Sequence, residues 1–319
     1  MRPFELTAPT TVEAALASPG TFLAGGTTLV DLMKLNVLTP QHVLDINEVP
    51  LSGIDTSDGL RIGSLERMTD IAGHPGVYPM ISRALLLSAS QQIRNMASIG
   101  GNLVQRARCS YFRDVAMPCN KRAPGTGCSA ISGANRMHAV LGTSDSCAAT
   151  HASDVAVALV ALDAEIRLVS TTGSRTVKLG EFYRLPGNTP DVENDLRPGE
   201  LITEVMVPRL DWASRSTYVK VRDRQSYEFA LSSAAVALDI QDSRVVDARV
   251  AAGGVATVPW RLPAVEAALR GVPATVASFE EAASLAADGA RPLSMNGFKT
   301  SLLKRTIVRA LLELTEESH

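Results

Sequence analysis

The four cysteines of this 319-residue chain are confined to one short stretch, and this grouping constrains the fold more than any other feature. They are Cys109, Cys119, Cys128 and Cys147, in an irregular sequence rich in Gly, Pro and Arg. Cysteines that serve only as small apolar side chains would spread over several elements. Four thiols in one loop region therefore predict a single tetrathiolate site, for which zinc and an iron–sulfur cluster are the common occupants.

The spacing of these cysteines does not choose between the two occupants. The pattern C-x9-C-x8-C-x18-C lacks both the C-x2-C knuckles of most structural zinc sites and the C-x2-C-x2-C run of ferredoxins. Positive charge would stabilise thiolates, and the segment offers it in Arg106, Arg108, Arg113, Lys121 and Arg122. The same five residues would also suit a solvated or partner-facing patch. We expect reduced thiols here rather than disulfides.

Composition excludes several classes of function. The chain is 45% hydrophobic and 20% charged, and its net charge of −2 gives no attraction to nucleic acid or to an anionic membrane. Aromatic residues make up only 4%, so stacking platforms for single-stranded bases are scarce. We see no signal core and no apolar run of membrane length. We therefore expect a cytoplasmic protein, or a periplasmic one if it is exported folded with a signal-bearing partner.

Two glycine pairs stand where a ligand can approach the backbone. In Ala24-Gly25-Gly26-Thr27-Thr28-Leu29, an expected strand over 21–24 runs into an expected helix over 29–35, a geometry that favours anion binding. Ser98-Ile99-Gly100-Gly101-Asn102 is expected to form a second turn, and two such turns can hold one pyrophosphate from two sides. Neither contains a Walker lysine or a G-x-G-x-x-G motif, so we expect neither a Mg-nucleoside triphosphate nor a Rossmann-bound dinucleotide as the ligand. A purely structural role for both turns stays open.

The remaining periodicity predicts an α+β chain that changes character near residue 211. Strands are expected at 42–46, 59–64 and 200–207, a hairpin at 165–179, and a helix that is apolar on all sides at 155–162. An antiparallel meander follows at 217–221, 232–240 and 246–252, then helices at 263–270, 278–287 and 296–316. We expect a first domain over 1–210, with a cysteine-rich insert at 104–150, and a second domain over 211–319.

No residues qualify as a catalytic set. The sequence offers no defensible Ser-His-Asp arrangement or pair of carboxylates. The isolated His42, His138 and His151 are expected to be hydrogen-bonded surface or loop residues rather than ligands. Substrate oxidation by this chain alone is therefore not expected.

Both glycine segments resemble the flavin-gripping motifs of the FAD-binding medium subunit of the xanthine dehydrogenase family of molybdenum hydroxylases. The resemblance continues through His151–Asp154, Glu200–Thr203 and Tyr218–Arg222 to Gly253-Gly254. The cysteine segment is similar to that of the flavin subunit of bacterial aldehyde oxidoreductases, a subgroup whose flavin subunit carries an extra [4Fe-4S] cluster.

This resemblance implies a vanillyl-alcohol-oxidase-type FAD-binding domain of two α/β subdomains, followed by a C-terminal antiparallel sheet with helices. It places the FAD pyrophosphate at the two glycine segments, Asp154 at the adenosine end, and Ile202 and Lys220 beside the isoalloxazine ring. The implied flavin contacts are Leu23, Ala24, Gly25, Gly26, Thr27, Thr28, Leu29, Ser98, Ile99, Gly100, Gly101, Asn102, Asp154, Ile202 and Lys220. The four cysteines would ligate the [4Fe-4S] cluster.

The resemblance also implies an electron-transfer flavoprotein within a heterotrimer. A large molybdopterin-binding subunit would oxidise the aldehyde, and a small subunit with two [2Fe-2S] clusters would pass the electrons to FAD, which delivers them to an external electron acceptor. Two alternatives stay open: a zinc-clasped binding module without redox activity, and a self-sufficient flavin oxidase. A visible spectrum with metal analysis separates the first from the flavoprotein, and aldehyde turnover by the isolated chain would support the second.

Overall fold

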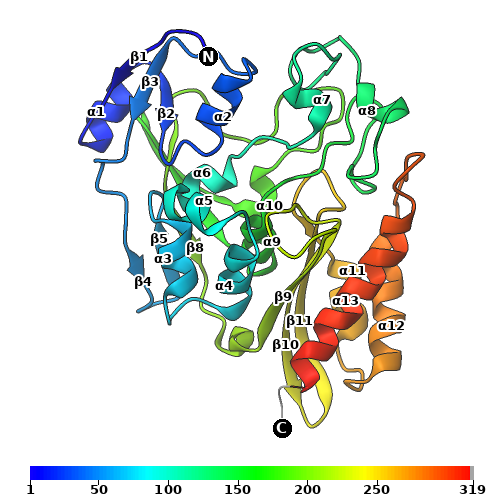
Figure 1. Cartoon of the computed structure of the whole chain (residues 1–319). Coiled ribbons are helices and arrows are strands. Elements are labelled where there is room, and N and C mark those ends of the chain that lie inside the picture. The colour runs from blue at the N-terminus through cyan, green and yellow to red at the C-terminus, as the bar shows by residue number, and fades with distance from the viewer. Residues whose placement is uncertain (317–319) are drawn as a thin grey trace.

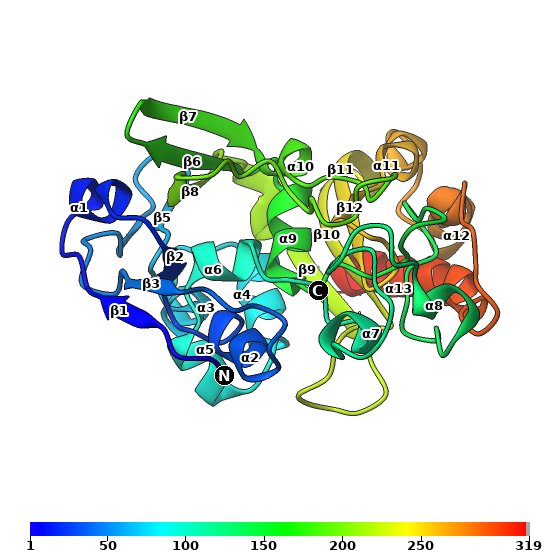
Figure 2. The same cartoon turned by 90° about the horizontal axis from the view of Figure 1, so that it is seen from above.

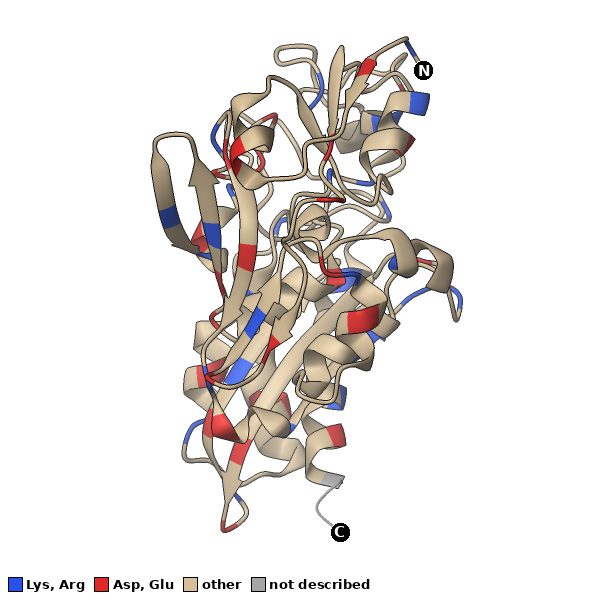
Figure 3. Ribbon diagram, turned by 90° about the vertical axis from the view of Figure 1, so that its left-hand side faces the viewer, with Lys and Arg blue, Asp and Glu red and all other residues tan. Residues whose placement is uncertain are grey.

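The computed structural model describes residues 1–316 and contains three β-sheets with helices packed on them (Figure 1). The predicted α+β class is confirmed, including an antiparallel sheet with helices in the C-terminal part. The last three residues of the predicted second domain lie outside the described residues. No helix in the described part of the chain is long and apolar enough to span a membrane. Figure 3 shows that acidic and basic residues are interspersed along the molecule.

The first sheet is small and entirely parallel. Strand β3 (His42–Asp45) lies between β1 (Glu5–Thr7) and β2 (Thr21–Leu23). Helix α1 (Val12–Ala17) begins after Thr11, whose hydroxyl accepts a hydrogen bond from the N–H of Ala14. Helix α2 (Leu29–Lys34) follows β2, so the first glycine pair lies at the carboxyl end of that strand. This edge of a parallel sheet is where ligands commonly bind.

The second sheet has five strands and is antiparallel at every pairing. Its order is β4 (Ile54–Asp55), β5 (Leu60–Gly63), β8 (Leu201–Val207), β6 (Glu165–Ser170) and β7 (Gly173–Lys178). The segment between β5 and the cysteines forms four short helices: α3 (Met68–Gly73), α4 (Pro79–Leu86), α5 (Gln91–Met96) and α6 (Ile99–Leu103). Helix α10 (Leu179–Phe182) follows β7.

The third sheet lies in the C-terminal part and is antiparallel, in the order β12 (Trp260–Arg261), β11 (Arg244–Gly253), β10 (Ser232–Gln241) and β9 (Ser216–Val221). The 3-10 turn η1 (Asp211–Ser214) leads into it. Helices α11 (Pro263–Leu269), α12 (Val276–Ser284) and α13 (Phe298–Glu316) cover one face, and the 3-10 turn η2 (Leu285–Ala287) follows α12 (Figure 1). The predicted meander and its three helices are confirmed.

Helix α9 (Asp154–Ala161) joins the second and third sheets. Every residue of this helix is buried, as its all-round apolar sequence predicts. It packs against β10 and β11 (Figure 2). It belongs to a core that also contains Ile166 of β6 and Val205 of β8. The first turn of α9 therefore stands where the two parts of the chain meet.

The cysteine segment lies between α6 and α9 and is mostly irregular. It contains two single-turn helices, α7 (Ser110–Arg113) and α8 (Ser129–Ser132). Phe112 and Cys119 pack with Leu32 of α2 in a small buried core. The segment is thus attached to the helix that follows the first glycine pair.

Candidate functional site

The first glycine segment presents bare backbone to a cavity. A Cβ atom on Gly25 would overlap the carbonyl oxygen of Met96, so only glycine lets the chain pass this close to the end of α5. Gly26 has a φ of +70°, which is the left-handed region that favours glycine. In the described residues, the N–H groups of residues 25–29 donate to no carbonyl oxygen or side chain. Five amides that need partners lie along one turn.

The second glycine segment is not the turn that we expected. Gly100 and Gly101 lie in the first turn of α6, where the hydroxyl of Ser98 caps the helix by accepting from the N–H of Gly101 at 3.3 Å. The N–H of Gly100 donates to the carbonyl oxygen of Ser64 at 2.8 Å. A Cβ on Gly100 would press on Ser64. This segment therefore contributes close backbone packing rather than free donors.

Two cavities meet at these segments. Cavity A has a volume of about 250 Å³ and contains most of both glycine segments, together with Ile202 at the start of β8. Cavity B has a volume of about 440 Å³ and contains Asn102, Asp154 and Lys220. Thr27, Thr28 and Gly101 line both cavities. Of the implied flavin contacts, all but Leu23 and Ile99 line one cavity or the other.

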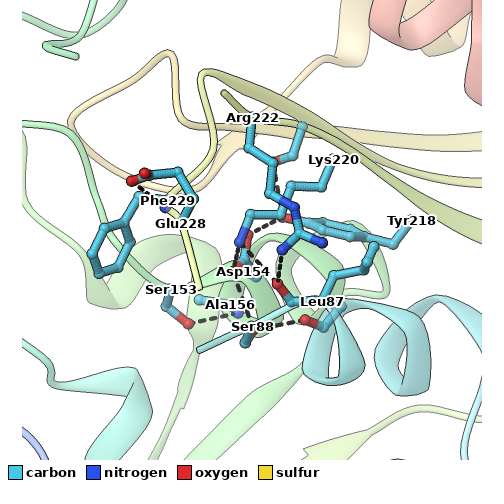
Figure 4. A network of polar contacts seen from close by, with 12 residues as sticks. Leu87, Ser88, Ser153, Asp154, Ala156, Tyr218, Lys220, Arg222, Glu228 and Phe229 are labelled. Carbon is cyan, nitrogen blue, oxygen red and sulfur yellow. Dashed lines mark hydrogen bonds and ion pairs between the residues drawn. The ribbon is translucent and has the colours of Figure 1, made fainter. Parts of the chain in front are cut away.

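A buried ion pair forms one wall of cavity B. Lys220 on β9 donates to the carboxylate of Asp154 at 2.8 Å and to the carbonyl oxygen of Leu87 at 3.1 Å (Figure 4). The lysine side chain is 1% exposed and that of Asp154 is 8% exposed. Ser88 donates to the same carboxylate at 3.1 Å, and Tyr218 donates to its other oxygen at 2.8 Å. Burial, with Asp154 adding, raises the pKa of Tyr218 well above its usual value, which keeps this hydroxyl a donor.

This pairing bears on the roles that the resemblance implied. It placed Asp154 at the adenosine end of FAD and Lys220 at the flavin ring, yet the two side chains are in contact. Ile202, implied to lie beside the ring, lines cavity A instead. Asp154 and Lys220 line the same cavity, and a role for each at a different end of FAD stays a prediction. The carboxylate of Asp154 accepts from Lys220 and Tyr218, while the single hydroxyl proton of Ser88 also faces the carbonyl oxygen of Ala84 at 2.6 Å.

Two members of this network, Ser88 and Tyr218, were not expected from the sequence to be site residues. Tyr218 stands two residues before Lys220 and lies on the same face of β9, which is the signal that could have found it. Ser88 follows α4 and has no distinguishing sequence context. In addition, Arg222 donates to the carbonyl oxygen of Leu87 at 3.0 Å, so this carbonyl accepts from two cations (Figure 4).

The four cysteines come together in one electrostatic group, and all are free thiols. Burial raises the pKa of Cys109 to about 11, with smaller contributions from Cys119 and Cys147. Burial also raises the pKa of Cys147, against the effect of Lys121, while Cys128 and Cys119 add to the rise. Cys119 and Cys128 face each other across an isolated β-bridge. A metal that binds the thiols of Cys109 and Cys147 must therefore displace their protons.

The cysteine side chains do not form a preassembled site for a single ion. Among residues 1–316, no three His, Cys, Asp or Glu side chains are placed to hold a single metal ion. The four thiols influence one another electrostatically, with Cys119 and Cys147 acting on Cys109 and with Cys119 and Cys128 acting on Cys147.

The basic residues of the segment are held mainly by carboxylates. Arg108 donates to Asp31 at 3.0 Å and Arg113 does so at 2.9 and 2.8 Å. Lys121 is 9% exposed and donates to Glu193 at 3.0 Å, and Arg106 pairs with the same carboxylate. Of these residues, Lys121 has an electrostatic effect on a thiol, that of Cys147. The segment is thus tied to α2 and to the loop that contains Glu193.

The isolated histidines differ from one another. His42 is exposed and lies 3.1 Å from Glu5, in line with a surface residue. His138 is a loop residue as expected, but it is only 5% exposed and its Nε2 lies 3.2 Å from the sulfur of Cys109. Burial lowers its pKa to about 4, with the charge of Lys299 adding to the effect. The pKa of His151 is lowered to about 3 by burial. Both rings are neutral at pH 7.

Comparison with known proteins gives the family. A family model described as the FAD binding domain in molybdopterin dehydrogenase matches residues 2–210, and one described as the CO dehydrogenase flavoprotein C-terminal domain matches residues 217–314. The chain is 47% identical, over 95% of each chain, to the aldehyde oxidoreductase FAD-binding subunit PaoB of Escherichia coli (strain K12). It is 34% identical to the glyceraldehyde dehydrogenase medium chain of Sulfolobus acidocaldarius, over 76% of this chain and 71% of that one.

Solved structures of related proteins have the same fold over nearly the whole chain. The chain superposes on a carbon monoxide dehydrogenase from Hydrogenophaga pseudoflava with a TM-score of 0.75 and 25% identity, over 99% of this chain and 98% of that one. A CO dehydrogenase from Oligotropha carboxidovorans shares the fold, with a TM-score of 0.77, 22% identity and complete coverage of both chains. The chain is therefore an FAD-binding medium subunit of the molybdenum hydroxylase family of oxidoreductases.

Proposed function

We propose that this chain holds FAD across the junction of cavities A and B. The observation that carries this is the row of unpaired N–H groups at residues 25–29, where the two cavities meet. A diphosphate carries acceptor oxygens for such donors and joins two bulky halves, as the two cavities require. Gly101 lines both cavities without a side chain, which leaves room for the same group.

The isoalloxazine ring belongs in cavity B and the adenosine half in cavity A. Cavity B has the ammonium of Lys220, whose position is fixed by Asp154 and the carbonyl of Leu87. A fixed positive charge stabilises negative charge that develops on a reduced ring. Cavity A is lined by apolar side chains that include Phe22, Leu65 and Ile202, which suit an adenine base. In this proposal, Asp154 positions Lys220 instead of binding ribose.

We further propose that Cys109, Cys119, Cys128 and Cys147 bind a [4Fe-4S] cluster, as the mutual influence of their thiols supports. When bound, FAD and the cluster would supply electron-transfer chemistry that the side chains lack. Residues of the chain bind and orient these groups, and no side chain of it acts on the aldehyde. The proposed boundary between the FAD-binding and C-terminal domains falls at residues 210 and 211.

The proposed assembly is a heterotrimer. A large molybdopterin-binding subunit would oxidise an aldehyde, a small subunit with two [2Fe-2S] clusters would relay electrons, and this chain would deliver them to an external acceptor. The relatives named above support this, since one is an aldehyde oxidoreductase FAD-binding subunit and another is the medium chain of a glyceraldehyde dehydrogenase.

The test is to purify the complex without oxygen, measure FAD, iron, sulfide and zinc per chain, and follow flavin absorbance after aldehyde is added. One FAD and four iron atoms per chain, with flavin bleaching by aldehyde in the complex but not in the isolated chain, is the expected result. A colourless chain with stoichiometric zinc would contradict this proposal and would instead support a zinc-clasped binding module without redox activity. The variant Lys220→Met should leave iron content unchanged while it slows flavin reduction, because the fixed charge is lost.

A further inference from the structure

His138 is the one side chain, in the described part of the molecule, that is hydrogen-bonded to a cysteine sulfur. Its Nε2 lies 3.2 Å from Sγ of Cys109. The sulfur of Cys147, in contrast, accepts from a backbone amide, the N–H of Ala149 at 3.4 Å. A side-chain donor is a property of the sequence at that position, whereas a backbone donor is present in any sequence with this fold.

The partners of the imidazole indicate which nitrogen carries the proton. Nδ1 of His138 is buried and makes no hydrogen bond of good geometry among residues 1–316, although the backbone of Asn135 is close enough to oppose the fall in the pKa of the ring. Nε2 faces the sulfur. A neutral imidazole carries one N–H, and its tautomer is set by the acceptor available. With Cys109 bound to iron as a thiolate, the charged sulfur is a stronger acceptor than the poorly aligned Asn135 backbone, so we assign the proton to Nε2.

The loop that holds His138 is unusually well fixed to the C-terminal domain. The backbone carbonyl of His138 accepts from Asn296 at 3.1 Å, and the carbonyl of Met137 accepts from Lys299 at 3.0 Å. Asn135 accepts from the N–H of Met295 at 2.9 Å through its side-chain oxygen. The side chains of Asn135, Asn296 and Lys299 are 0% exposed.

Buried polar side chains of this kind fix a single loop conformation, because every alternative would leave them unpaired. Lys299 also donates to the carbonyl of Gly254 at 2.7 Å, so both of its acceptors lie on the main chain. The position of the imidazole relative to Cys109 is therefore set by the fold of the C-terminal domain and not by the cysteine loop alone.

We infer that His138 is a positioning residue that raises the reduction potential of the [4Fe-4S] cluster by donating a hydrogen bond to the thiolate of Cys109. This inference rests on the proposed function, since it requires the cluster. The reduced cluster carries one more negative charge than the oxidised cluster, and part of it resides on the ligand sulfurs. A donor to sulfur therefore stabilises the reduced form more than the oxidised form.

The test is a redox titration of the cluster, followed by electron paramagnetic resonance, in the anaerobically purified complex. His138→Leu removes the donor and should shift the one-electron equilibrium about tenfold toward the oxidised cluster. This shift lowers the reduction potential of the cluster by about 59 mV. His138→Gln keeps an N–H donor of similar reach and should restore most of the shift. His151→Gln is the control, because this second buried imidazole accepts from the N–H of Ser153 and touches no sulfur.

The possible outcomes separate the two proposals. Absence of iron from the wild-type complex would overturn the cluster itself. A wild-type cluster whose potential is the same in His138→Leu, or shifts equally in His138→Leu and His138→Gln, would overturn the role of His138 alone. If His138→Leu loses its iron, His138→Met replaces it in the titration. Loss of iron in the Leu, Met and Gln variants alike would show that the imidazole is needed for cluster binding, and this would also overturn the inference.

Discussion

Asp31 connects the cysteine segment to the helix that follows the first glycine pair. It stands in the first turn of α2, and its carboxylate accepts from Arg108 at 3.0 Å and from Arg113 at 2.9 and 2.8 Å. Arg113 ends α7, which begins after Cys109. The substitution Asp31→Asn removes the charge from this junction but keeps its shape, and it leaves the two guanidinium groups without a counter-charge.

The magnitude follows from the exposure of the three side chains. A hydrogen bond to a charged group contributes about 1.5–3 kcal/mol when it is buried. Here the arginines are 24% and 23% exposed and Asp31 is 35% exposed, so solvent screens part of each interaction. We therefore expect a loss of about 2 kcal/mol in the free energy of unfolding. In a chain of this length that corresponds to a fall in melting temperature of about 3 °C.

The assay is thermal unfolding at fixed FAD concentration, with flavin content measured after gel filtration. Because Asp31 lines cavity B and Thr27 and Thr28 lead directly into α2, FAD should be retained less well in Asp31→Asn. Asp211→Asn is the matched control, since Asp211 pairs with Arg209 at 2.7 Å on the open surface. Equal melting and equal flavin content in the wild type and Asp31→Asn would refute the reasoning.

Three further predictions concern the same sites. Gly25→Ala should abolish FAD binding in a flavin titration, because a Cβ at this position overlaps the backbone at the end of α5. Gly73→Ala is the control and should bind FAD normally, because a Cβ at Gly73 meets no atom within 4 Å. Cys119→Ser should lower iron and FAD content together, measured on one sample, because Cys119 packs against α2; full FAD retention would show that the two sites are independent. Burial lowers the pKa of Lys299 to about 7 from 10.5, so above pH 7 the unfolded chain binds more protons than the folded chain. The free energy of unfolding should therefore rise as the pH is raised from 7 to 9. Above pH 9 the thiol of Cys109 begins to titrate in the unfolded chain and opposes the rise. In denaturant titrations, Lys299→Met should show a smaller rise than the wild type.

The fold was predictable where periodicity was strong. Helix α9 is apolar on all sides and is buried on all sides, and the β6–β7 hairpin and the C-terminal meander follow clear alternation and turn signals. Short elements were missed because three to five residues carry too little pattern, as in β1 and α7. Helix α6 contains two glycines, which disfavour helix in isolation, and is stabilised by the cap of Ser98 and by backbone bonds to the β5 region.

The site was predictable only in part, because the sequence locates motifs but not their partners. The glycine segments and cysteines could be recognised from residue type and grouping. The contact between Asp154 and Lys220 joins residues that are 66 positions apart and depends on how α9 packs on β9. The approach of His138 to Cys109 likewise depends on Asn296 and Lys299, which stand far along the chain. Such pairings are set by tertiary packing, which a single sequence does not display.

The most direct test is an experimental structure of the FAD-loaded complex. It should show the diphosphate against the N–H groups of residues 25–29, the isoalloxazine ring in cavity B beside Lys220, and the adenosine half in cavity A beside Ile202. A ring that lies beside Ile202 with adenosine at Lys220, or a diphosphate that makes no contact with residues 25–29, would contradict the account.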